Sequence, residues 1–394
     1  MKTNLVLFIM MLSVIGCTPD EKMSVSNDGA IVIDVNSALK NEPRYLDDIV
    51  ESVELIPLET TEASIVGGFG ITGTITDQYI YAEDIYNQAH GLIIFERNGK
   101  FVKRILPGNG PEEVPYFENV FYSDEFLYIL GAQRLAKYTS NGEFVDYQQF
   151  KDLAIDIQKI GDGFLTILPQ YQNKQKKFKI IKYNSNLKKV SENSLVPIPF
   201  PNAFKSLSSV DGVNCLVYRF ADNNIYNYAN DDFRVKYRLE YPDYEYHLTY
   251  NDYKNLSSEE QRSVHHYLSN NMGDNKFIFS GTLHNSEDYL LIDMSSKGFR
   301  NQMIVYNKKT GKTWKCEYPR ENNTIFNIMD KSSNMDHIIG QKNSFYGSIT
   351  PGYKEDSSIN NTHNLLSAKD IEILKNAKED DNPIIVIYKL KDNL

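Results

Sequence analysis

The chain has 394 residues, of which 41% are hydrophobic and 24% are charged, with 27 Tyr and 20 Phe. Disordered chains are poor in aromatic residues, so this composition excludes a mainly disordered protein and predicts a folded body. The formal net charge of −10 argues against nucleic acid as a partner, because an acidic surface repels phosphates.

The N-terminus has the pattern of a secretory signal peptide over residues 1–16. Lys2 supplies a positive charge, and the apolar run Leu5–Ile15 is too short to span a bilayer stably. The small residue Gly16 directly before Cys17 resembles the bacterial lipobox, in which the Cys thiol is acylated. The resemblance predicts lipid attachment at Cys17. The alternative is an ordinary signal peptide with an incidental Cys.

Polar residues dominate residues 17–30, so we expect a flexible tether there, followed by one folded domain over residues 31–394. Several acyl chains anchor a protein stably where a single chain would not. We therefore expect an outer-membrane lipoprotein, on either the periplasmic or the cell-surface face, whose lipid anchor makes the membrane a partner.

Short runs of alternating apolar and polar residues, bounded by turn residues, begin at Ile31 and are typical of β-strands. The two clearest units have strands at residues 79–82, 91–95 and 101–105, and at 126–130, 135–138 and 144–147. An Asn-Gly pair precedes the last strand of each unit, at Asn98-Gly99 and Asn141-Gly142. Each pair predicts a type I′ turn, in which both residues have positive φ.

Looser copies follow, so that aromatic-aliphatic strands begin near residues 79, 126, 164, 215, 289 and 345. Repeats of this size and type are propeller blades, which stack in a ring because one blade cannot bury both of its faces. The abundant Tyr and Phe would fill the gaps between blades. The predicted fold class is all-β, a six-bladed β-propeller.

Two stretches interrupt the strand pattern, and we expect both to be short helices inserted between strands. Residues 257–270 open with the spacing of a capping box, at Ser257 and Glu260. Residues 367–378 open with the same spacing, at Ser367 and Asp370, and end before Asn382-Pro383.

Several motifs together resemble a known family. They are the lipobox, the strand Val53–Thr60, the segment Asn98–Phe101, the loop Gly108–Glu113, and Asp381-Asn382-Pro383 before an apolar strand. The chain resembles, over about Asp48–Leu394, the six-bladed β-propeller lipoproteins of Bacteroidetes, which are related at fold level to NHL-repeat propellers. The resemblance implies ring closure between a strand near Glu51–Glu59 and one near Ile384–Tyr388, but no particular activity.

Two segments hold the candidate ligand-binding residues. Glu112 and Glu113 could bind a hard cation or an amine on one propeller face. In the alternative, they belong to a structural loop in which a carboxylate caps backbone N–H groups. Tyr244 and Tyr246 could stack on sugar rings; in the alternative they pack the first inserted helix onto the blades.

Cys215 and Cys316 lie in separate strand-like runs, and an exported protein could pair them. Pairing needs adjacent strands in facing register, so we favour two separately buried thiols.

The sequence carries no catalytic signature, neither Gly-x-Ser-x-Gly nor His-Glu-x-x-His. We assign no catalytic residue, metal ligand or cofactor. We expect a membrane-anchored, exported binding module with a glycan, peptide or protein partner. The alternative is an exported hydrolase or lyase, with a metal or carboxylate site at the mouth of the propeller channel, built from residues far apart in sequence.

Overall fold

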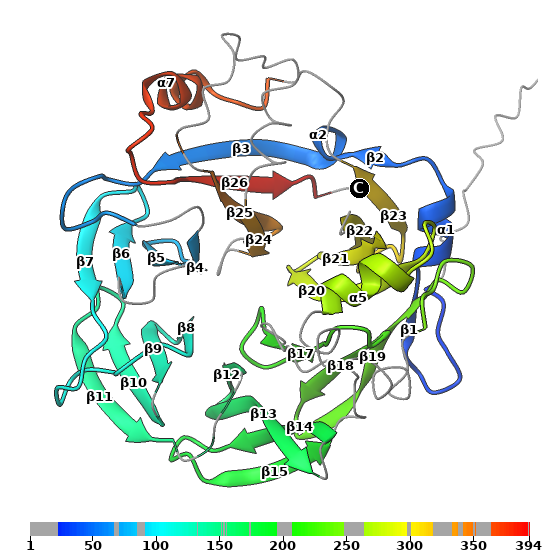
Figure 1. The fold of residues 1–394 in the computed structure, drawn as a ribbon, viewed down its shortest axis with the longest axis horizontal. Coiled ribbons are helices and arrows are strands. Elements are labelled where there is room, and N and C mark those ends of the chain that lie inside the picture. Colours follow the sequence, from blue (N-terminus) through cyan, green and yellow to red (C-terminus); the bar gives the residue numbers. More distant parts are fainter. Residues whose placement is uncertain are drawn as a thin grey trace, which may run out of the picture.

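Six sheets stand around a central axis in the computed structural model (Figure 1). The structure describes residues 23–66, 71–84, 91–131, 133–150, 152, 154, 156–172, 175–194, 207–247, 264–297, 301–317, 333–337, 342–349, 351, 364–392 and 394. Each sheet is built on four antiparallel strands and forms one blade. The predicted six-bladed β-propeller is therefore confirmed.

The blades follow one another in chain order, and each runs from the central axis to the outer rim. Blade 1 holds β4 (Ile71–Ile75), β5 (Tyr79–Asp84), β6 (Leu92–Glu96) and β7 (Phe101–Ile105). Blade 2 holds β8 (Asn119–Ser123), β9 (Phe126–Gly131), β10 (Arg134–Thr139) and β11 (Phe144–Gln149). Blade 3 holds β12 (Asp156–Ile160), β13 (Gly163–Gln172), β14 (Gln175–Tyr183) and β15 (Lys189–Ser194).

The second half of the ring contains longer connections. Blade 4 holds β16 (Leu207–Ser208), β17 (Cys215–Val217), β18 (Asn224–Ala229) and β19 (Asp232–Glu240). Blade 5 holds β20 (Phe277–Asn285), β21 (Tyr289–Ser296), β22 (Asn301–Asn307) and β23 (Thr313–Glu317). Blade 6 holds β24 (Ser333–His337), β25 (Ser344–Ile349), β26 (Ile384–Leu390) and β3 (Val50–Pro57).

The N-terminal part of the chain closes the ring. β3 pairs antiparallel with β26, with Ile56 opposite Ile385 and Glu54 opposite Ile387. The last blade thus takes its outer strand from the start of the domain. This is the closure that the family resemblance implied.

The same segment also adds strands to two earlier blades. β1 (Ile31–Asp34) runs parallel to β19, and β2 (Arg44–Tyr45) runs parallel to β23. Two helices that the sequence did not predict, α1 (Val35–Lys40) and α2 (Leu46–Ile49), separate these strands. Residues 31–57 therefore cover the outer edges of blades 4, 5 and 6 in turn.

Both regions where we expected inserted helices contain one. α7 (Ala368–Asn376) begins at Ser367, whose side chain accepts from Asp370 N while Asp370 accepts from Ser367 N, which is the predicted capping box. α5 (Val264–Asn271) lies within the other region. Ser257 and Glu260, the expected start of that helix, lie outside the described residues.

The Asn-Gly turns differ from the predicted type I′ geometry. Gly99 and Gly142 have φ of +91° and +85°, but Asn98 and Asn141 are not among the residues with positive φ. Gly99 N donates to Glu96 O at 2.8 Å, and the strand register shifts nearby. These features fit a type I turn followed by a left-handed glycine that forms a bulge, a geometry that Asn-Gly also satisfies.

The apolar core is divided among the six junctions between neighbouring blades. Each of six buried clusters combines side chains from two adjacent blades. Tyr and Phe dominate the largest fully buried side chains, with Tyr81, Tyr289 and Phe345 among them. The aromatic load of the sequence thus packs between blades, as expected.

Cys215 and Cys316 are free and buried, and they belong to different clusters. This confirms two separate thiols. No helix in the described part of the chain is long and apolar enough to cross a membrane.

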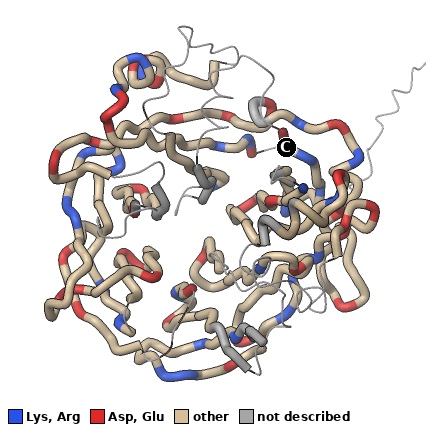
Figure 2. Tube along the Cα trace, viewed as in Figure 1, with Lys and Arg blue, Asp and Glu red and all other residues tan. Residues whose placement is uncertain are grey.

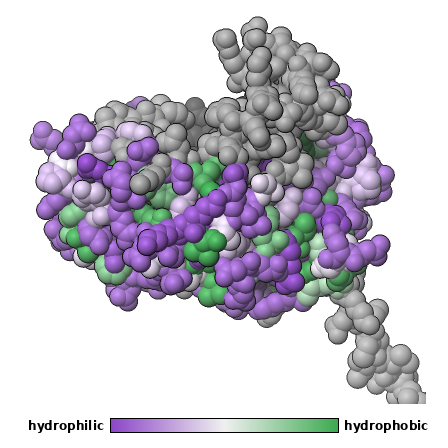
Figure 3. All heavy atoms as spheres, turned by 90° about the horizontal axis from the view of Figure 1, so that it is seen from below, coloured by the Kyte–Doolittle hydropathy of each residue, from purple (hydrophilic) through white to green (hydrophobic). Residues whose placement is uncertain are grey.

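Charges of both signs are interspersed around the ring (Figure 2). The outer wall on the side of β15 is largely hydrophilic with scattered apolar patches (Figure 3).

Candidate functional site

Glu112 and Glu113 lie exposed in the connection between blades 1 and 2. Glu113 Oε2 accepts from Gly110 N at 2.7 Å, so this carboxylate caps its own loop. Tyr138 Oη donates to Glu112 O at 3.0 Å and ties the loop to blade 2. These contacts favour the structural alternative for Glu113, whereas the Glu112 side chain has no partner among the described residues.

Tyr244 and Tyr246 lie in the connection between blades 4 and 5. The Tyr244 ring meets the Phe277 ring edge-on, with centroids 6.3 Å apart. Tyr246 Oη donates to Tyr267 Oη on α5 at 3.3 Å, and its ring packs against the buried Leu268 and Met272. These contacts pack α5 onto blade 5, which favours the alternative to sugar stacking.

These four residues therefore belong to two different connections of the ring, and none of their contacts joins one pair to the other. Cys17 lies outside the described residues.

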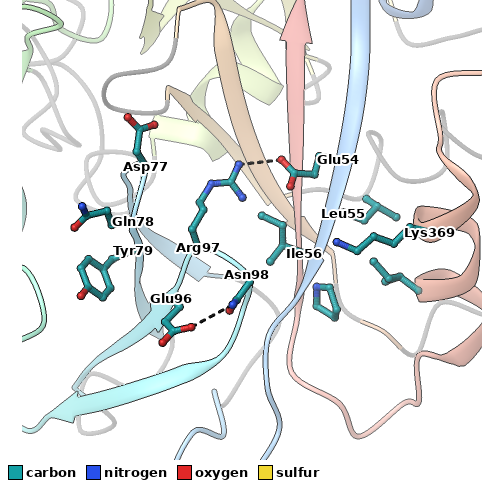
Figure 4. Close-up of a pocket in the computed structure, with 12 residues that line it drawn as sticks. Glu54, Leu55, Ile56, Asp77, Gln78, Tyr79, Glu96, Arg97, Asn98 and Lys369 are labelled. Atoms are coloured by element: carbon teal, nitrogen blue, oxygen red, sulfur yellow. Dashed lines mark hydrogen bonds and ion pairs between the residues drawn. The ribbon is translucent and has the colours of Figure 1, made fainter.

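A groove of about 910 Å³ lies where the last blade meets the first (Figure 4). Three elements line it: the outer strand β3, the two hairpin turns of blade 1, and α7. Its lining residues are Glu54, Leu55, Ile56, Pro57, Asp77, Gln78, Tyr79, Glu96, Arg97, Asn98, Lys369 and Ile373.

The two turns of blade 1 form one wall of the groove. Arg97 N donates to Gln78 O at 2.7 Å, which holds the turns together. Arg97 Nη2 then lies 2.9 Å from Glu54 Oε2 of β3, so an ion pair joins blade 1 to blade 6 (Figure 4). Glu54 is 52% exposed and Arg97 is 19% exposed.

Helix α7 forms the opposite wall and is attached to the sheet by a buried carboxylate. Asp370 Oδ1 accepts from Leu55 N on β3 at 2.8 Å. Its other oxygen accepts from Ser367 N at 2.9 Å at the start of the helix. Asp370 thus fixes the position of its neighbour Lys369, which reaches toward the groove (Figure 4).

The groove contains charges of both signs and several unused hydrogen-bonding groups. The lining contains three carboxylates, of Glu54, Asp77 and Glu96, and two cationic side chains, of Arg97 and Lys369. The side chains of Gln78, Tyr79 and Lys369 have no hydrogen-bond partner among the described residues. The described lining includes no Ser, Cys or His, so this arrangement suits noncovalent recognition of a charged, polar ligand.

None of these residues was predicted to form a site. Both β3 and the Asn98-Gly99 turn were among the predicted motifs, but only as family features. Their meeting depends on ring closure, which brings residues 54–57 beside residues 96–98.

A second group lies where blades 5 and 6 meet and consists of the half-buried Asp293 and the buried His284. Tyr289 and Leu291 of β21 pack into the cluster between these blades, so the alternating strand pattern directs Asp293 to the same side. Burial raises the pKa of Asp293, and the nearby His284 of β20 lowers it in part. Asp293 has no hydrogen-bond partner among the described residues. A carboxyl of this kind can donate or accept a proton.

No group of three or more His, Cys, Asp or Glu in the described part of the chain is placed to hold a metal ion.

Comparison with a solved structure of an exported protein supports the fold. A presumed exported protein from Bacteroides fragilis is similar with a TM-score of 0.68 at 15% identity, covering 89% of this chain and 98% of that one. A member of the DUF4221 family from Bacteroides vulgatus has a TM-score of 0.45 at 11% identity, covering 87% and 97%. A search of curated protein sequences found no match.

A family model matches residues 30–389, which include all six blades. The chain therefore belongs to the family described as Domain of unknown function (DUF4934).

Proposed function

We propose that this protein is an exported, lipid-anchored binding protein whose groove between blades 6 and 1 holds a polypeptide segment. The observation that carries the proposal is the set of free polar groups in that groove, on Gln78, Tyr79 and Lys369, beside carboxylates of blades 1 and 6. Propellers commonly bind through residues that a rigid ring holds in place. The lipobox resemblance at Cys17 supports the anchor.

The charges favour a polypeptide over a glycan. A neutral sugar is bound mainly by hydrogen bonds and by stacking on aromatic faces, and Tyr79 is the one aromatic side chain in the described lining. A polypeptide can place a basic side chain near Asp77 and Glu96 and an acidic one near Lys369. The groove therefore matches a segment that carries charges of both signs.

Selection from a random-peptide display library, run in parallel with a glycan array, tests the ligand class. We expect enrichment of peptides with a basic residue, and at least a tenfold loss of their binding in Asp77→Lys and in Glu96→Lys. The matched control is Asp146→Lys, at an exposed site on β11, which should bind as the wild type does. Glycan binding without peptide binding would contradict the proposal, as would peptides whose binding survives both groove variants.

The anchor has its own test. Cys17→Ala should move the protein from the membrane fraction to the soluble fraction and abolish labelling by a fatty-acid probe. A variant that stays firmly membrane-bound would overturn lipid attachment at Cys17.

The half-buried Asp293 and the neighbouring His284 favour one second candidate, an exported hydrolase or lyase with a carboxylate site. A carboxyl with a raised pKa is suited to proton transfer. A panel of hydrolase and lyase substrates should then reveal an activity that Asp293→Asn lowers at least a hundredfold. An activity unchanged in that variant would exclude this role for Asp293.

A further inference from the structure

Met23, the first described residue, contacts blade 5. Tyr306 Oη donates to Met23 Sδ at 3.8 Å, and a methyl group placed on Gly311 would lie 3.0 Å from Met23 Cγ. Val32 N donates to Ser24 O at 2.9 Å, which holds the next residues against β1. Asp28 Oδ2 lies 2.6 Å from Arg238 Nη2. Hydrogen bonds from the Ser26 hydroxyl and from Arg238 lower the pKa of Asp28 to about 2. Residues 23–30 are thus attached to blades 4 and 5.

The point of attachment identifies one face of the ring. Because successive strands are antiparallel, the turns joining strands one to two and three to four of a blade lie at the same end. In blade 5 these turns touch, since Lys308 N donates to Asp288 O at 2.8 Å. We call residues 286–288 and 308–312 the turn face of blade 5. Met23 lies against this face, whereas α5 precedes β20 and therefore lies at the opposite end of the blade.

Chain length then limits how far the turn face can be from the lipid. Met23 is the sixth residue after Cys17, and an extended chain of six residues spans at most about 20 Å. β22 has seven residues, so the opposite face of blade 5 is a further 20 Å or so away. We infer that the turn face of blade 5 lies next to the bilayer surface and that the opposite face projects away from it. This inference rests on the proposed lipid anchor.

The side chains of the turn face suit the phosphate groups of a bilayer. Lys309 Nζ and Lys342 Nζ lie 2.8 and 3.2 Å from Asp288 Oδ2, and that carboxylate is buried beneath them. Lys309 and Lys312 are exposed, as are the acidic Glu287 and Asp392 nearby. The surface therefore presents the ammonium groups of Lys309, Lys312 and Lys342 to the bilayer beside two exposed carboxylates, while the acid that pairs with Lys309 and Lys342 is shielded.

Fluorescence quenching in vesicles tests this orientation with the full, acylated chain. Thr310→Cys places a label on the turn face, and Asn270→Cys places a matched label at an exposed position of α5, which packs at the opposite end of blade 5. Cys215 and Cys316 are buried and Cys17 carries the lipid, so each variant has one accessible thiol. With nitroxide-headgroup lipids in the vesicles, we expect the label at residue 310 to be quenched at least twofold more than the label at 270.

The outcomes separate this inference from the proposed function. Equal quenching, or stronger quenching at residue 270, in a protein that stays on the vesicles would overturn the orientation and leave the anchor intact. A protein that carries no lipid and does not remain on the vesicles would overturn the anchor, and the orientation with it. Cys17→Ala in both labelled variants should abolish quenching at both positions.

Discussion

Asp293 is an ionisable group that becomes half-buried on folding, without a hydrogen-bond partner in the described structure. Burial raises its pKa above the value of about 3.9 in an unfolded chain. The folded protein therefore keeps this proton to higher pH than the unfolded chain does. The stability that the protonated carboxyl contributes is complete below the unfolded pKa and is lost as pH rises through the folded pKa.

Asp293→Asn should therefore raise the melting temperature at pH 7, because the amide cannot ionise. Melting curves followed by circular dichroism at pH 7 and pH 4 test this. The difference in melting temperature between the variant and the wild type should be smaller at pH 4. Asp146→Asn, exposed on β11, is the control and should leave the melting temperature unchanged. A lower melting temperature for Asp293→Asn at pH 7 would show that the carboxylate has a stabilising partner.

The two buried thiols give a second prediction at this scale. Burial raises the pKa of the Cys215 thiol, which keeps it protonated and unreactive. In the Cys17→Ala protein, a thiol reagent at pH 8 should find no reactive thiol in the folded state and two after unfolding in guanidinium without reductant. No thiol after unfolding would indicate a disulfide between Cys215 and Cys316.

Residue types alone could not separate a binding role from a structural one. Glu113 and Tyr246 were both candidates with a structural alternative, and their contacts, to Gly110 N and to Tyr267 on α5, favour that alternative. Nothing in the local sequence fixes where an exposed carboxylate or a tyrosine hydroxyl finds its partner.

At the scale of elements, the helix and strand predictions that depended only on residues close together in the sequence were confirmed. The capping box of α7 could be predicted because Ser367 and Asp370 bond to each other's backbone within one turn. The second, third and fourth strands of blades 1 and 2 were also predicted, because their apolar faces alternate. The innermost strands β12 and β24 were missed, because their Asp, Gln, Lys, Ser and Asn residues hide the alternation.

Asp370 links α7 to β3, and its removal gives a prediction about both elements. Its side chain is 4% exposed and accepts from Leu55 N, Ser367 N and Ser367 Oγ. Asp370→Ala removes the Asp370 half of the capping box and leaves Leu55 N buried without its partner, so we expect a loss of about 3 kcal/mol in the free energy of unfolding. Urea unfolding of the variant and the wild type measures this change in the free energy of unfolding.

The matched control is Glu372→Ala, an exposed position on the same helix, which should change the free energy of unfolding by less than about 0.5 kcal/mol. Equal effects of the two substitutions would mean that Asp370 does not stabilise the junction.

For the whole molecule, the sequence repeats predicted the number of blades, and the family resemblance implied the closing pair β3 and β26. The groove could not be predicted in the same way. Its lining comes from residues 54–57, 77–79, 96–98, 369 and 373, and only the closed ring brings these together. A site assembled by closure leaves no local motif, because no single segment contains enough of its residues to form one.

Closure also depends on a close approach between blade 1 and the end of β3. Gly99 has φ of +91°, and a Cβ there would lie 2.1 Å from Pro57 O. Glu59 N donates to Gly99 O at 2.8 Å across the same junction. Gly99→Ala must therefore strain the left-handed backbone and also push β3 away, and we expect a loss of about 3 kcal/mol or more in the free energy of unfolding.

Gly161→Ala separates these two costs. Gly161 has φ of +56° with nothing within 4 Å of its added Cβ, so this variant carries the backbone strain alone, about 1 kcal/mol. Urea unfolding of both variants measures the difference, which is the contribution of the close approach at the seam. If Gly99→Ala lowers the free energy of unfolding no more than Gly161→Ala does, the contact between blade 1 and β3 does not stabilise ring closure. The groove between them would then lack a rigid wall.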